Sequence, residues 1–295
     1  MRKIGLLIGT CAAFLVMDDR PVAAQSSVSA EEATRRVNIA GRQRMLSQRM
    51  TKAACLISQG IAPEAAMAEV EAAFSLFVAS DSALREGDPA MGLSPETERA
   101  VAEALARTEA PWASFRDLIA RGITSGSFAP YQMAALDEAG LALLQEMNLA
   151  VFETARVYAD AGIGMPEGQT ITVDVAGRQR MLSQRAVKEA CMMRVASDPA
   201  IYAAQLAETV QLFDLSLSAL QVGYDQVGVI AAPTDAVTEK LDQVRMLWGP
   251  VKELLDRAAG GSVLDDAELA LLQTRTEGLL QVMDEAVGLY EIGTE

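Results

Sequence analysis

Residues 40–49 read Ala-Gly-Arg-Gln-Arg-Met-Leu-Ser-Gln-Arg, and residues 176–185 repeat the same ten residues in the same order. The shift between the two stretches stays constant along the rest of the chain, which indicates an internal duplication. Its period is the size of a domain and far longer than a solenoid repeat, so we expect two copies of one fold. Other identities at this shift are Lys52 with Lys188, Pro63 with Pro199, Trp112 with Trp248 and Met147 with Met283.

The composition favours helices. Of the 295 residues, 51% are apolar and 5% aromatic, and no convincing run alternates with the period-two pattern of a strand. In the first copy we expect helices over residues 30–59, 63–85, 94–121 (kinked at Pro111) and 130–160. In the second copy we expect a helix over 172–196 and further helices after Pro199, after Pro233 and near Asp265. Short loops between long helices imply antiparallel neighbours, so the prediction is all-α, with two tandem antiparallel four-helix bundles.

The first residues have the pattern of a secretory signal. Arg2 and Lys3 precede an apolar run over residues 4–16, and small residues at 22–24 suit a cleavage site. A membrane anchor would need a longer apolar run. We therefore expect a periplasmic protein that does not insert into the membrane after cleavage. The predicted division is a signal peptide over 1–24, a first domain over 25–161, a linker over 162–168 and a second domain over 169–295.

Charge and composition exclude several classes of function. The formal net charge of −15 argues against nucleic acid and anionic lipid as partners. The chain has no histidine, which removes the Ser-His-Asp arrangement and every His-ligated metal site. The short Gly-Ile-Gly stretch at 162–164 has no strand before it, so it is not a nucleotide-binding loop. We expect no enzyme activity, no cofactor and no metal.

The repeated stretch has a second face opposite its apolar core stripe. On a helix this face is small and mildly polar, with an arginine in its middle, and the natural partner of such a face is its counterpart in the other copy. In the first copy it carries Gly41, Arg44, Ser47, Gln48 and Cys55, and in the second Gly177, Arg180, Ser183, Gln184 and Cys191.

Pairing these two faces would bring Arg44 and Arg180 together. Two facing guanidinium groups repel each other and are costly to desolvate, and a small bound anion would resolve both problems. The alternative is that each arginine is an ordinary solvated surface residue. Ser47, Gln48 and their counterparts are either secondary ligands or polar packing residues. Arg42 and Arg49 lie on a different face, where we expect salt bridges to neighbouring helices.

Cys55 and Cys191 are the two cysteines left after cleavage, and they lie on the same face as the arginines. In an exported protein two cysteines can form a disulfide. Parallel helix axes at ordinary spacing can still hold two such residues too far apart. A disulfide and two buried free thiols are therefore alternatives, and we favour the free thiols.

The motif from Asn38 to Met50 resembles that of the PilJ-type domain, the N-terminal ligand-binding region of type IV pili methyl-accepting chemotaxis transducers. It is also similar to the sensor domain of NarX-type nitrate/nitrite kinases. That likeness implies that nitrate or nitrite binds between two such helices through Arg44 and Arg180, beside Gly41 and Gly177. Asp174 stands where the first copy has Asn38, which makes the implied pocket asymmetric.

The resemblance implies a sensory protein without its own output. No transmembrane helix, kinase or signalling domain follows the predicted signal peptide, so a separate membrane-bound sensor, transducer or transporter would be its partner. The alternative is a structural or interaction module of the cell envelope, associated with a pilus or chemoreceptor, that has no small-molecule ligand.

Overall fold

A computed structural model describes residues 28–163 and 167–292. The predicted signal peptide lies outside the described residues. The first copy contains α1 (Ala30–Ser58), α2 (Pro63–Glu86), η1 (Pro89–Met91), α3 (Arg99–Arg107), α4 (Glu109–Ser125), η2 (Pro130–Gln132) and α5 (Met133–Asp160). The second contains α6 (Glu167–Met192), α7 (Pro199–Val222), η3 (Asp225–Val227), α8 (Asp235–Ala259) and α9 (Asp266–Ile292).

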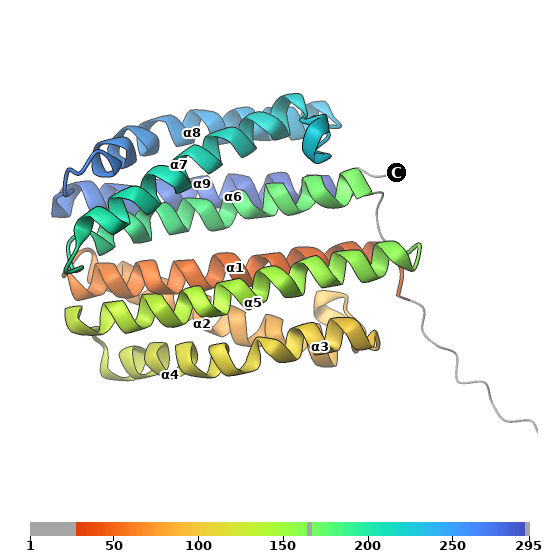
Figure 1. The fold of residues 1–295 in the computed structure, drawn as a ribbon, viewed down its shortest axis with the longest axis horizontal. Coiled ribbons are helices and arrows are strands. Elements are labelled where there is room, and N and C mark those ends of the chain that lie inside the picture. Colours follow the sequence, from red (N-terminus) through yellow and green to blue (C-terminus); the bar gives the residue numbers. More distant parts are fainter. Residues whose placement is uncertain (1–27, 164–166, 293–295) are drawn as a thin grey trace, which may run out of the picture.

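The two copies form two helical bundles that meet along α1 and α6 (Figure 1). In the first bundle α1 packs against α2 and α5, and in the second α6 packs against α7 and α9. Both helices run in the same direction, because α1 residues 44 and 55 contact α6 residues 174 and 191 respectively. The described residues contain no strand, so the predicted all-α fold of two tandem bundles is confirmed.

Local signals account for most of the helix starts. Ser29 caps α1 by accepting a hydrogen bond from the backbone N–H of Glu32 at 3.1 Å. Proline occupies the first turn of both α2 and α7, where its missing N–H costs no helical hydrogen bond. Thr234 caps α8 by accepting a hydrogen bond from the backbone N–H of Val237 at 3.3 Å. By contrast, α6 begins five residues before its predicted start and ends four residues before its predicted end.

The third helix of the first copy differs from its prediction. Ser94 and Glu96 do not begin a helix, because they bind α1 instead: Ser94 N–H donates to the Glu32 carboxylate at 2.8 Å, and Glu96 pairs with Arg36 at 3.2 Å. The helix starts at Arg99 and breaks at Thr108, dividing into α3 and α4. The break lies three residues before Pro111, since proline removes a helical hydrogen bond and clashes with the carbonyl four residues earlier.

Each bundle has its own aromatic centre, and the duplication places it at equivalent positions. Trp112 stacks on Phe77 with ring centroids 4.0 Å apart, and Trp248 stacks on Phe213 at 3.9 Å. Along the described ranges, no helix combines the length and apolar character that crossing a membrane requires.

Candidate ligand-binding site between α1 and α6

Arg44 and Arg180 both lie in the interface between the copies, and each side chain is 1% exposed. Each guanidinium folds back over the glycine of its own motif. A Cβ added to Gly41 would lie 3.2 Å from Arg44 Nη2, and one on Gly177 would lie 3.5 Å from Arg180 Nη2. A side chain at position 41 would therefore crowd the Arg44 guanidinium, whereas one at position 177 would make an ordinary contact with that of Arg180.

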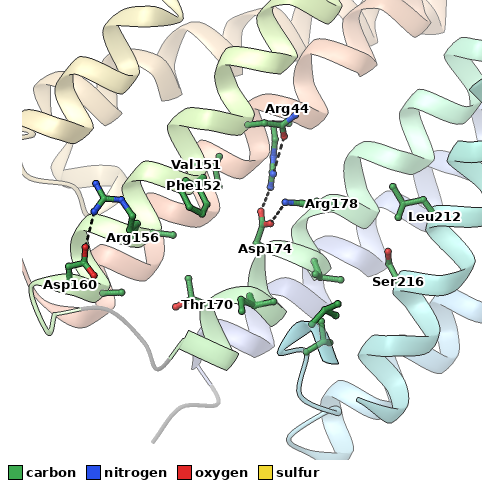
Figure 2. A pocket seen from close by; sticks show the side chains of 17 residues that line it. Arg44, Val151, Phe152, Arg156, Asp160, Thr170, Asp174, Arg178, Leu212 and Ser216 are labelled. Atoms are coloured by element: carbon green, nitrogen blue, oxygen red, sulfur yellow. Dashed lines mark hydrogen bonds and ion pairs between the residues drawn. The ribbon is translucent and has the colours of Figure 1, made fainter. Parts of the chain in front are cut away.

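Arg44 is held by two neighbouring helices. Its Nη2 donates to Asp174 Oδ1 of α6 at 2.6 Å, and its Nη1 donates to Asn148 Oδ1 of α5 at 3.3 Å. Asp174 is shared, because its second oxygen pairs with Arg178 Nη2 at 2.7 Å (Figure 2). Asp174 is 18% exposed, so this carboxylate is held from two sides in a largely desolvated position.

Arg180 also contacts two neighbouring helices, but its amide and carboxylate partners have changed places relative to those of Arg44. Its Nη2 donates to Asn38 Oδ1 of α1 at 2.5 Å, and its Nη1 pairs with Asp284 Oδ1 of α9 at 2.5 Å. Asn38 is the counterpart of Asp174, and Asp284 is the counterpart of Asn148. Each arginine therefore has one carboxylate and one amide, but they come from opposite helices in the two halves.

Burial lowers the pKa of the Arg44 guanidinium; the Asp174 carboxylate opposes this shift, and Arg178 and Arg180 reinforce it. The like charge of Arg180 thus adds to the effect of burial on Arg44. Arg180 also keeps an unused donor, because its buried Nε has no hydrogen-bond partner among the described residues. Its acidic partner Asp284 is 55% exposed and lies at the edge of the site.

The tandem arrangement of the two bundles agrees with a match to a known family. Residues 26–137 and 166–273 match the family described as "Type IV pili methyl-accepting chemotaxis transducer N-term", or PilJ. The chain belongs to this family. A curated relative, the methyl-accepting chemotaxis protein McpN of Pseudomonas aeruginosa, is 33% identical over 113 residues. That alignment covers 38% of this chain and 20% of McpN, so the likeness concerns one part of a longer protein.

The serines and glutamines of the PilJ motif lie in the same interface, one turn beyond the arginines. Ser47 Oγ donates to Arg44 O at 2.9 Å, and Ser183 Oγ donates to Arg180 O at the same distance. Gln184 Oε1 accepts from Lys52 Nζ at 2.7 Å. Its counterpart in the first PilJ copy differs: Gln48 Oε1 is buried and unpartnered within the described ranges.

Two buried lysines add to the polar side chains of this interface, although in the sequence they stand out only as identities between the two copies. Lys52 Nζ pairs with Glu69 at 2.7 Å, while Lys188 Nζ pairs with Asp137 at 2.6 Å. Both lysines are at most 1% exposed. Arg49 also pairs with Glu69, at 3.1 Å, which confirms the salt bridge predicted for it. The two PilJ copies therefore contact each other through charged as well as apolar side chains.

Cys55 and Cys191 form a disulfide between the two PilJ copies, with 6.2 Å between their Cα atoms. Our preference for free thiols is therefore wrong. The close approach of α1 and α6 brings the Cα atoms within the usual range for a disulfide.

Proposed function

We propose that this protein is an exported sensory protein that binds a small oxyanion, nitrate or nitrite, between α1 and α6. It would signal the binding of the anion to a membrane-bound sensor, transducer or transporter. The observation that carries the proposal is the pair of buried arginines contributed by identical motifs of the two PilJ copies. Membership of a chemotaxis transducer family supports a sensory role, and the residues over 1–24 support export to the periplasm.

The two halves of the site offer unequal access to an anion. Asp174 is held by two arginines, whereas Asp284 is 55% exposed and can turn into water. An anion therefore enters on the Arg180 side, where it takes the place of Asp284 and gains the unused Nε donor. Charge-assisted hydrogen bonds contribute roughly 1.5–3 kcal/mol each. Because displacing Asp284 has its own cost, we expect an affinity weaker than about 1 μM.

The alternative function is an interaction module of the cell envelope without a ligand. The observation that favours it is that each arginine already has a carboxylate partner, Asp174 or Asp284, so neither charge needs an anion. In this case the Arg44–Asp174 ion pair and the hydrogen bond from Arg180 to Asn38 would fix the relation of the two bundles, and the outer helices would contact a partner protein.

A titration separates the two functions. We expect nitrate or nitrite, but not chloride or sulfate at equal ionic strength, to raise Tm with saturation. Arg180→Gln abolishes this rise, and Asp284→Ala increases anion affinity because it removes the competing carboxylate. Arg99→Gln is the control, since Arg99 is 91% exposed. If all four salts act equally on the wild type and on Asp284→Ala, the anion site is excluded and the interaction module remains.

A further inference from the structure

A groove of about 1100 Å³ runs beside the Arg44–Asp174 pair, between the two bundles. One wall comes from α5 and carries Phe152, and the other comes from α7 and carries Leu212 (Figure 2). Residues of α6, among them Asp174, lie between these walls. The groove is therefore shaped by both copies and reaches the α1/α6 interface at the Arg44–Asp174 pair.

The walls are apolar and exposed on both sides. Phe152 is 63% exposed, Leu212 is 47% exposed and Val227 of η3 is 53% exposed. A single exposed apolar residue is ordinary, but three large ones that converge on one concavity are typical of a binding site. The counterpart of Phe152 in the second copy is Gly288, so the duplication does not repeat this wall.

The charge inside the groove is positive although the protein is strongly acidic. Among the described residues that line it are the arginines 44, 156 and 178 and the aspartates 160 and 174. Asp174 carries one negative charge but serves two guanidinium groups, those of Arg44 and Arg178. Arg156 is 46% exposed but pairs with both Glu153 and Asp160. Arg178 is 50% exposed and shares its one carboxylate with Arg44, so its charge is the more accessible to a ligand.

We propose that this groove binds a small amphipathic monocarboxylate. Its carboxylate pairs with Arg178, and its apolar body lies between Phe152 and Leu212. A guanidinium fork suits a carboxylate, and the ligand supplies the negative charge that Asp174 cannot give to both arginines. An inorganic anion would leave the apolar walls in water, and an uncharged hydrophobic molecule would leave Arg178 unmatched. Arg44 and Asp174 line this groove as well as the α1/α6 interface, but the carboxylate pairs with Arg178, whereas the oxyanion of the proposed function binds on the Arg180 side.

The test measures binding of benzoate, octanoate and indole-3-acetate by calorimetry, with benzamide and octanol as uncharged counterparts. We expect saturable binding of at least one carboxylate. Its uncharged counterpart should bind about tenfold more weakly or worse, because one charge-assisted hydrogen-bond pair is lost. Competition with the carboxylate by nitrate is not expected.

Two variants probe the contacts, and two controls match them. Arg178→Gln and Phe152→Ala should each weaken binding about tenfold, and both side chains are exposed enough for the variants to fold. Leu149→Ala is the apolar control, being 50% exposed on the same helix and outside the groove lining. Arg99→Gln is the charge control. Circular dichroism confirms folding of each variant.

Three results would overturn the proposal. The first is the absence of saturable binding by all three carboxylates. The second is equal binding by the wild type and by folded Arg178→Gln and Phe152→Ala. The third is a wild-type dimer, seen by analytical ultracentrifugation, that dissociates in Phe152→Ala, because the groove would then be covered by a second copy of the chain.

Discussion

Single side chains make the two halves of the duplicated interface chemically different. The Asn38/Asp174 and Asn148/Asp284 pairs exchange amide for carboxylate in opposite senses, so each buried arginine keeps one negative partner. A buried guanidinium without such a partner would be strongly destabilising. Each arginine thus keeps one carboxylate partner. For Arg44 it comes from α6, across the interface, and for Arg180 it comes from α9 of its own bundle.

This exchange predicts the behaviour of Asp174→Asn. The variant leaves Arg44 with two amides and no carboxylate, so its free energy of unfolding should fall by about 1–3 kcal/mol. Adding Asn148→Asp restores a carboxylate from α5 and reproduces the set around Arg180, so the double variant should recover most of the loss. Urea denaturation measures both changes. Equal stabilities of the single and double variants would show that the loss comes from Arg178, the other partner of Asp174.

The sequence predicted which residues meet in the interface but not how they are neutralised. Identical ten-residue stretches were enough to place Arg44 and Arg180 on facing helices. The carboxylate of Asp284 belongs to α9, far from the motif in sequence, and no periodicity links it to Arg180. The groove was also missed, since its wall depends on Phe152, where the two copies differ.

Among the helices, the third of each copy shows how far the duplication has diverged. α8 is continuous through Pro250, whereas its counterpart is divided at Thr108 into α3 and α4. Arg85 of α2 fills the break: its Nη2 donates to Leu105 O at 2.8 Å and to Thr108 Oγ1 at 3.0 Å. Leu105 O, which also accepts from the backbone N–H of Thr108 at 3.0 Å, therefore has a charged donor at the break. The second copy has Gln221 at the position of Arg85.

Replacement of Arg85 by alanine tests this role. We expect Arg85→Ala to lower the free energy of unfolding by about 1–2 kcal/mol, because Leu105 O loses a charge-assisted hydrogen bond. Guanidinium denaturation provides the measurement. Arg99→Ala, which removes an exposed arginine from α3, should leave the midpoint unchanged. A midpoint of Arg85→Ala equal to that of Arg99→Ala would mean that the break needs no support from α2.

Helix existence was easier to predict than helix limits, and the reason is physical. A constant shift and a 3.6-residue apolar period mark buried faces along a whole helix. Helix ends depend on single contacts made elsewhere in the fold. Ser94 and Glu96 have the composition of a helix start, but Glu32 and Arg36 of α1 bind them in a non-helical segment. These contacts with α1 exist only in the folded protein, so the local sequence does not reveal them.

Taken together, the two bundles are tied at both ends of the α1/α6 pair. The disulfide joins the helices near their C-terminal ends, and the chain passes from α5 to α6 at the opposite end. Arg44 lies eleven residues before Cys55, or about 16 Å along the helix. A change of occupancy between the arginines would therefore bend or rotate the helices about the disulfide more easily than slide them past each other.

The disulfide closes a loop with a sequence separation of 136 residues, so its removal should lower stability substantially. We expect Cys55→Ser combined with Cys191→Ser to lower the free energy of unfolding by about 2–5 kcal/mol, through the greater entropy of the unfolded chain. The helix content should persist, because the hydrophobic core that spans both bundles is otherwise unchanged. Hydrogen exchange should then increase first near residues 55 and 191, while the segment around Arg44 stays protected by its ion pair and hydrogen bonds. Uniform loss of protection along α1 and α6 would instead mean that the covalent link, and not the polar layer, holds the two copies together.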